Sequence, residues 1–99
     1  MNIYNKSSVN KFARKHAECK DALFAWYDYV KTVSWDTPND IKKSFPKASV
    51  IGKGTHLVVF DILGGNYRLV VSINYRNKWV FIKWFGTHSD YDKIDVTKL

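Results

Sequence analysis

The spacing of hydrophobic residues changes near residue 48, and this change limits the folds open to the chain. Before that point apolar residues recur about every 3.6 residues, as they do on one face of a helix. The clearest series predicts a helix from about Cys19 to Ser34. Its apolar positions are Leu23, Trp26, Tyr27, Val30 and Val33. Beyond residue 48 apolar and polar residues alternate, so helices followed by strands predict the α+β class.

Two further helices are expected in the first half of the chain. Ser7 or Ser8 suits the cap of a first helix, because serine hydroxyls accept hydrogen bonds from free backbone N–H groups. The apolar face of that helix consists of Val9, Phe12, Ala13 and His16. A short polar link joins it to the helix over residues 19–34, which predicts a helical hairpin.

Start and stop signals predict a third, short helix. Thr37 suits the N-cap, Pro38 suits the first helical position, and Asp40 can reach back to the cap. The helix is expected to end at Phe45-Pro46, because a proline restricts the residue before it to extended conformations.

The second half predicts a meander of antiparallel strands, covered by the helices on one side. The expected strands are residues 49–51, 55–62, 67–75 and 78–85, with Ile3-Tyr4 as a short edge strand. The turns between them are Gly52-Lys53-Gly54, Gly64-Gly65-Asn66 and Arg76-Asn77. Glycine and asparagine tolerate the positive φ angles of tight hairpins. With 99 residues and no internal repeat, the chain is expected to be a single domain over residues 1–99.

Alternation assigns the two faces of this sheet. The side expected to face the helices carries Leu69, Val71, Ile73 and Tyr75. The side expected to be open carries Arg68, Ser72, Asn74 and Arg76, with Val70 among them. In the last strand, one side holds Trp79, Phe81, Lys83 and Phe85, and the other holds Val80, Ile82 and Trp84. Trp84 is interpreted as core, whereas Trp79 and Phe81 fit either a core or an exposed surface that stacks on unpaired bases.

The net charge of +7 favours a polyanionic partner. No Asp or Glu occurs between Ile62 and Ser89. The cations in that stretch are Arg68, Arg76, Lys78 and Lys83. A surface of one sign is typical of phosphate binding, whereas charges that serve solubility are mixed in sign.

Several classes of protein are disfavoured. Cys19 is the sole cysteine, which excludes an internal disulfide and favours a reducing, cytoplasmic location. No secretory signal or membrane-spanning run is present, so no membrane partner is expected. The histidines, the cysteine and the acids lack metal-ligand spacing, and phosphate-loop and serine-hydrolase motifs are missing, so neither metal nor cofactor is expected.

One constellation after the last strand fits chemistry. His88 and Tyr91 are three residues apart, which in a first helical turn places both side chains on one side. Histidine exchanges protons near neutral pH, and Arg68 and Lys83 are suited to stabilise charge that develops on a phosphate. A ribonuclease that works without metal needs these parts, although a lone histidine after a strand is more often structural.

Five runs of the sequence are specific in combination. They are Pro38-Asn39-Asp40-Ile41-Lys42, Val59-Phe60-Asp61-Ile62, Gly65-Asn66-Tyr67-Arg68-Leu69-Val70, Val80-Phe81-Ile82-Lys83 and Gly86-Thr87-His88-Ser89-Asp90-Tyr91-Asp92-Lys93. Together they resemble the HigB-type toxins of the RelE superfamily. The resemblance implies a type II toxin that cleaves mRNA without metal, typically on translating ribosomes, and a HigA-like helix-turn-helix antitoxin as its partner. The implied fold has an N-terminal helical hairpin on one face of a curved antiparallel sheet and RNA on the other.

The resemblance also implies roles for individual residues. The strand arginine of the family falls on Arg68, and its C-terminal histidine and tyrosine fall on His88 and Tyr91. The last-strand cation, commonly arginine, is Lys83 here, which keeps the charge but loses the bidentate fork. His16 is the nearest match to a hairpin histidine that is functional in some relatives.

The leading hypothesis is therefore a ribosome-associated endoribonuclease. His88 would act as general base or acid, Tyr91 would orient it or handle the second proton, and Arg68 and Lys83 would bind the scissile phosphate. Further RNA contacts are expected from Asn74, Arg76 and Lys78. Two alternatives stay open, namely a non-catalytic RNA- or ribosome-binding module of the same fold, and a structural protein whose open sheet face binds another protein.

Overall fold

The computed structural model describes residues 1–52 and 56–99. In chain order the elements are β1 (Asn2–Tyr4), α1 (Lys6–Lys15), η1 (Ala17–Cys19), α2 (Lys20–Thr32), α3 (Pro38–Ser44), β2 (Ser49–Ile51), β3 (Leu57–Ile62), β4 (Tyr67–Asn74), β5 (Trp79–Thr87), α4 (His88–Tyr91) and η2 (Val96–Lys98). The α+β class is confirmed, and each expected strand is present among the described residues. Part of the turn expected at residues 52–54, and Thr55 of the expected third strand, lie outside them.

The strands form one sheet in the order β1-β5-β4-β3-β2. From β2 to β5 every neighbouring pair is antiparallel, which confirms the meander. β1 instead pairs in parallel with β5, aligning Asn2 with Trp79 and Tyr4 with Phe81. The edge strand expected at Ile3-Tyr4 is thus present, and its pairing with β5 is the one parallel pairing among the described strands. β1 reaches β5 through the rest of the chain rather than through a hairpin, so no turn imposes the antiparallel direction.

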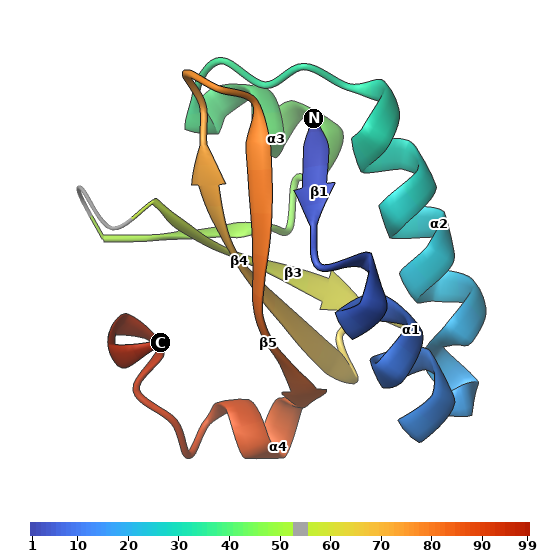
Figure 1. The fold of residues 1–99 in the computed structure, drawn as a ribbon. Helices are drawn as coiled ribbons and strands as arrows, with labels where there is room; N and C mark the ends of the chain where they lie inside the picture. Colours follow the sequence, from blue (N-terminus) through green and yellow to red (C-terminus); the bar gives the residue numbers. More distant parts are fainter. Residues whose placement is uncertain (53–55) are drawn as a thin grey trace.

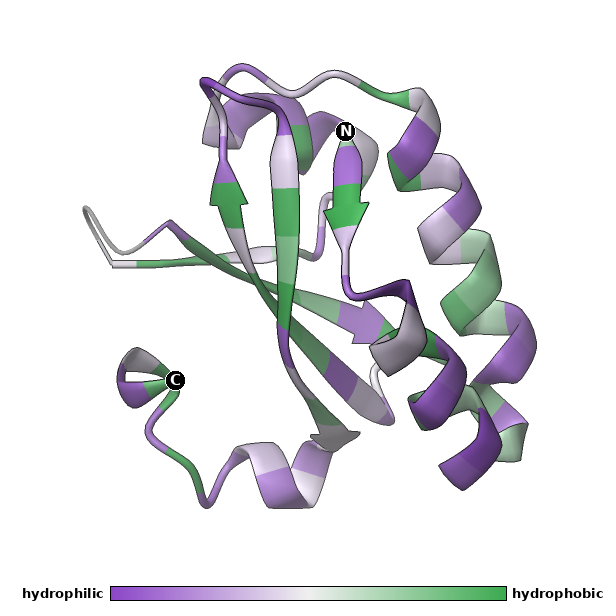
Figure 2. Cartoon of the chain, viewed as in Figure 1, coloured by the Kyte–Doolittle hydropathy of each residue, from purple (hydrophilic) through white to green (hydrophobic). Residues whose placement is uncertain are grey.

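Both long helices pack on one face of the sheet, as Figure 1 shows. The core between them takes Val9, Leu23 and Val30 from the helices and Leu69, Val71 and Ile73 from β4. Hydrophobic residues gather in the strands and in α2, whereas α1 is largely hydrophilic (Figure 2). The face assignment for β4 is therefore confirmed. Within residues 1–52 and 56–99, no helix has the length and hydropathy needed to cross a membrane.

The first helix starts earlier than expected. Asn5 is its N-cap, with a left-handed φ of 73°, and neither Ser7 nor Ser8 caps it. β1 ends at Tyr4, so the chain must turn sharply at once. Asparagine is one of the few residues that adopt the left-handed conformation at low cost.

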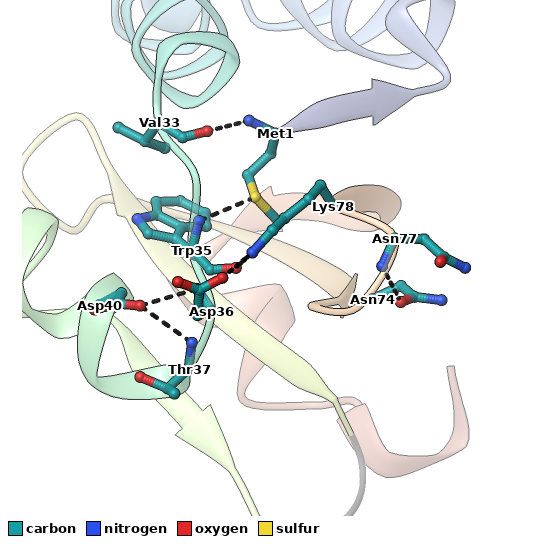
Figure 3. Close-up of polar contacts among 9 residues, drawn as sticks. All are labelled: Met1, Val33, Trp35, Asp36, Thr37, Asp40, Asn74, Asn77 and Lys78. Carbon is teal, nitrogen blue, oxygen red and sulfur yellow. Dashed lines mark hydrogen bonds and ion pairs between the residues drawn. The ribbon is translucent and has the colours of Figure 1, made fainter.

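The linker before α3 is attached to the start of β5 (Figure 3). The Asp40 carboxylate accepts hydrogen bonds from the backbone N–H groups of Asp36, at 2.9 Å, and Thr37, at 3.2 Å. This confirms the predicted start of α3. Lys78 Nζ donates to the Trp35 carbonyl oxygen at 3.0 Å and also pairs with Asp36. The helix layer is thus tied to the turn between β4 and β5.

β4 and β5 pair with a shift of register that reverses two side-chain assignments. Val71 is opposite Ile82 and Val70 is opposite Trp84, so Lys83 has no counterpart and forms a bulge. A bulge adds one residue to one strand, and every later side chain changes face. Phe85 therefore joins the helix-side core, and Trp84 lies on the opposite face, half-buried. The interpretation of Trp84 as core is correct only in part, because the half-buried indole packs against the smaller cluster of Leu57, Val59 and Val70.

Aromatic rings surround Phe60 in the helix-side core. Its ring centre is 5.4 Å from that of Trp26, 6.1 Å from that of Trp35 and 5.0 Å from that of Phe45. Phe60 is 1% exposed, so β3, α2 and the segment around α3 depend on one side chain for their packing.

Replacing Phe60 with Ala is expected to lower the free energy of unfolding by about 3–5 kcal/mol, because it removes a buried ring and leaves a cavity. Urea denaturation measures the change. Leu99→Ala, at an exposed position, is the control and should change the free energy by less than about 0.5 kcal/mol. Equal effects of the two substitutions would show that Phe60 does not organise this core.

Candidate active site

The outer face of the sheet is the face turned away from α1 and α2. Strand pairing aligns Asp61 with Arg68, Val70 with Trp84, Ser72 with Phe81 and Asn74 with Trp79. Because paired residues share a face, all of these side chains belong to the outer face.

The centre of this face is covered by the C-terminal part of the chain. Val59 and Val70 are 3% and 0% exposed, and Tyr91 and Val96 pack against the cluster that contains them. Figure 1 shows α4 and the residues after it on the side of the sheet away from α1 and α2. The expectation that this whole side is open is therefore wrong at its centre. Burial of these aliphatic side chains beneath the C-terminal residues stabilises the fold. The polar residues of β4 on this face lie toward its two ends.

Arg68 lies near the end of the sheet where β4 begins. Its Nη1 donates to the Gly65 carbonyl oxygen and is 3.3 Å from Oδ1 of Asp61, its partner across the strands. The Arg68 side chain is 18% exposed. The stretch from residue 62 to residue 89 contains no carboxylate, but strand pairing brings in one from just outside it. The guanidinium is thus fixed in place and partly neutralised.

Trp84 lies over the strand position opposite Arg68. That position is Gly86, where a Cβ atom would be 2.7 Å from Cη2 of Trp84. Glycine is therefore needed to leave room for the indole. The ring centres of Trp84 and Tyr91 are 6.0 Å apart, so the indole connects this part of β5 to α4.

His88 is placed at the same end by the start of α4. The Thr87 hydroxyl oxygen accepts a hydrogen bond from the Asp90 N–H at 3.1 Å and caps the helix. The His88 N–H donates to the Asn66 carbonyl oxygen in the turn before β4, at 3.0 Å. The imidazole is 53% exposed, and its Nε2 is 3.6 Å from Oδ2 of Asp92. The imidazole is therefore exposed, with one carboxylate close to it.

Lys83 is exposed on β5 at the bulge. A bulge re-aims its side chain relative to a regular strand, and such bulges often lie beside functional sites. Lys83 is the central residue of β5 and lies three residues before Gly86, the position that pairs with Arg68.

Asn74, Arg76 and Lys78 lie together at the opposite end of β4. The Asn74 amide oxygen accepts a hydrogen bond from the Asn77 N–H at 2.9 Å, which closes the turn. Arg76 is exposed and lines a hollow of about 460 Å³ together with Asn74. Lys78 is engaged with the linker before α3 (Figure 3). Of these three expected RNA contacts, Arg76 is the most available.

His16 lies on the helix side of the sheet. Its ring centre is 5.2 Å from that of Tyr67 and 5.5 Å from that of Phe85, and its Nδ1 is 3.8 Å from Oε1 of Glu18. Tyr67 donates a hydrogen bond to Glu18, which raises the pKa of Tyr67 to about 12 and lowers the pKa of Glu18. His16 thus lies on the face of the sheet opposite to that of Arg68.

Comparison with known proteins identifies the family of the chain. Residues 19–94 match HigB_toxin, described as the RelE-like toxic component of a toxin-antitoxin system. The chain belongs to the HigB toxin family. A curated relative, the mRNA interferase HigB of Escherichia coli O6:H1 (strain CFT073), is 31% identical over 94 residues, which cover 95% of this chain and 91% of the relative. The HigB-type resemblance is confirmed, and the fold is consistent with the RelE-like arrangement.

Two carboxylates of this HigB toxin were missed by the sequence interpretation. Asp61 contacts Arg68 and Asp92 contacts His88. The four-residue spacing of His88 and Asp92, one helical turn, was a signal that could have found the second pair. The first pair depends on strand register, for which the sequence carried no comparable signal.

The acidic, histidine and cysteine side chains of the toxin are dispersed. In the part of the chain that the structure describes, no three of them gather in a way that could hold a metal ion. The titratable side chains near the Arg68 end include the imidazole of His88, the phenol of Tyr91 and the carboxylates of Asp61, Asp90 and Asp92.

Gly86→Ala is expected to destabilise the toxin by about 1–3 kcal/mol, because the added methyl group must displace the indole of Trp84. A double-mutant cycle checks this. In a Trp84→Ala background the same change should cost much less, since the clashing ring is gone. Additive effects in urea denaturation would argue against the contact.

Tyr67→Phe is expected to flatten the pH dependence of stability at both extremes. The folded pKa of Glu18 is lowered, so its contribution is present above its unfolded pKa near 4.5 and is lost as the pH falls through the folded value. The pKa of Tyr67 is raised, so its contribution is complete below pH 10 and is lost as the pH rises toward 12. Urea midpoints across pH measure both changes. The control is Tyr29→Phe, and parallel curves for Tyr67→Phe and the wild type would contradict the assignment.

Proposed function

We propose that this toxin is an endoribonuclease that cleaves mRNA without a metal ion. The observation that carries the proposal is the position of an exposed imidazole, with its Nε2 3.6 Å from Oδ2 of Asp92, at the end of the sheet where Arg68 lies. Family membership supports a toxic activity restrained by an antitoxin. The name of the relative, mRNA interferase, supports the choice of substrate.

The proposed reaction is an in-line attack within the RNA strand. A general base removes the proton of a 2′-hydroxyl, and the 2′-oxygen bonds to the adjacent phosphorus. The bond to the 5′-oxygen then breaks, and an acid supplies the proton that this oxygen takes. The products are a 2′,3′-cyclic phosphate and a new 5′-hydroxyl end. His88 serves as base or acid, and Tyr91 orients it or transfers the second proton.

Arg68 and Lys83 bind the phosphate under attack and stabilise the charge that develops on it. Arg68 already holds one anion, the Asp61 carboxylate, at 3.3 Å. A phosphate oxygen can take the place of Asp61, and the hydrogen bond to Gly65 keeps the guanidinium in position meanwhile. Holding the cation in advance lowers the entropy cost of binding.

Cleavage is proposed to occur in the cytoplasm, on mRNA held by translating ribosomes. The partner is proposed to be a helix-turn-helix antitoxin of the HigA type, for which the described toxin-antitoxin family is the support. Asn74 and Arg76 extend the contact to RNA away from the cut, as their position at the other end of the outer face permits.

Arg68→Ala is expected to lower the rate of mRNA cleavage by about 10²–10³-fold, the usual effect of losing one group that stabilises transition-state charge. The toxin is induced in a host, and new mRNA 5′ ends are mapped within translated codons. Purified toxin with and without ribosomes then tests ribosome dependence.

Asp61→Asn is the matched control, because it removes the other half of the ion pair and leaves the guanidinium charged. It should retain cleavage, and thermal unfolding should show that both variants are folded. Native cleavage by Arg68→Ala would remove that residue from the mechanism. Salt-sensitive RNA binding without new 5′ ends would indicate a binding module, and salt-insensitive binding would indicate a protein contact.

A further inference from the structure

We infer that Tyr4, Phe81 and Trp79 form a stacking platform for unpaired RNA bases, at the end of the outer face away from His88. The inference rests on the proposed function, since it assigns a second contact to the same RNA strand. It concerns nucleotides away from the cleaved bond. None of the three residues belongs to the proposed catalytic cluster, which consists of Arg68, Lys83, His88 and Tyr91.

The three rings form a row across two strands. β1 aligns Tyr4 with Phe81, and their ring centres are 5.8 Å apart. The centres of Phe81 and Trp79 are 6.3 Å apart, with planes inclined by 26°. Pairing of Phe81 with Ser72 and of Trp79 with Asn74 places the row on the outer face.

The platform is exposed although its side chains are large and apolar. Tyr4 is 55% exposed and Trp79 is 38% exposed, and the two flank the half-buried ring of Phe81. The C-terminal residues that cover the centre of the outer face pack instead on the cluster of Leu57, Val59 and Val70. Exposed apolar side chains that gather in one place mark a binding surface more often than scattered ones do.

The chemistry beside the rings favours RNA as the occupant. A hollow of about 460 Å³ adjoins Phe81, and its lining includes His56, Ser72, Asn74 and Arg76. Its described lining contains no carboxylate. An arginine there suits a phosphate, the hydroxyl and amide groups suit base edges, and the rings suit base faces. An acceptor-rich, negatively charged strand is thus complementary to every part of this surface.

The platform and the catalytic cluster are far enough apart to act on different nucleotides. β4 runs from Arg68 beside the cluster to Asn74 beside the platform, six residues that span about 20 Å at the usual rise of a strand. An RNA strand held at both points would be fixed in register as well as in position. The platform would therefore contribute to affinity and to the choice of cleavage position, without touching the reacting atoms.

The test uses a short 2′-O-methyl oligoadenylate, which has no free 2′-hydroxyl and so cannot be cleaved by the proposed reaction. Trp79→Ala should weaken its affinity by about 5- to 150-fold, the range of stacking contributions per base. Trp79→Phe should retain most of the affinity, because the ring remains. Tyr29→Ala, at a residue of α2 that is 43% exposed on the helix side, is the matched control and should bind as the wild type does.

A second probe separates stacking from charge. With an abasic oligonucleotide of the same length, Trp79→Ala and the wild type should bind equally weakly. Trp79→Ala should leave the salt dependence of oligoadenylate binding unchanged, whereas Arg76→Ala should reduce its slope. Thermal unfolding checks that each variant is folded.

Several results would contradict the inference that the three rings stack on RNA bases. They are unchanged affinity in Trp79→Ala, equal losses in Trp79→Ala and Tyr29→Ala, and absence of oligoadenylate binding by the wild type. A loss of antitoxin binding alone would show that the surface binds protein. None of these affects the Arg68→Ala cleavage result, so the proposed function can stand without the platform. Stacking by a protein that cleaves no mRNA would leave the platform and reject the nuclease.

Discussion

The register shift between β4 and β5 at Lys83 determines the composition of the outer face. One extra residue in β5 sends Phe85 to the helix-side core and brings Trp84 to the outer face. Without the shift, Trp84 would belong to the core and could not cover Gly86 or contact Tyr91. The position of α4, and with it the surroundings of His88, therefore depends on a local departure from regular strand pairing.

The charge on the outer face depends on which side chains contact one another as well as on the composition of the chain. The chain carries a net charge of +7, yet Arg68 and His88 each lie within 4 Å of a carboxylate oxygen, at 3.3 and 3.6 Å. The contact with Asp61, together with the hydrogen bond to Gly65, holds the Arg68 side chain in place and offsets part of its positive charge. Toward the other end of β4, Arg76 is exposed beside aromatic rings. The two ends of the outer face therefore differ, with charges close to carboxylates at one end and an exposed cation at the other.

The two layers that cover the sheet have different compositions. The helix side is a continuous apolar core, with an aromatic cluster around Phe60. Among the described residues, the outer side is covered at its centre, where Tyr91 and Val96 pack on three aliphatic residues. The main apolar core thus lies on the helix side, and the outer face has exposed polar and aromatic side chains toward its ends.

Local sequence patterns alone determined the order and type of the elements. The helical repeat predicted both ends of α2 to within two residues. Thr37, Pro38 and Asp40 predicted the start of α3, and alternation predicted which side of β4 faces the helices. These features depend on neighbours within one helical turn or one strand. Tertiary structure decided the parallel direction of β1, the bulge at Lys83, the pairing of Asp61 with Arg68 and the cover over Val70. Each of these arises where segments distant in the chain meet, and spacing within a single segment carries no information about which residues meet.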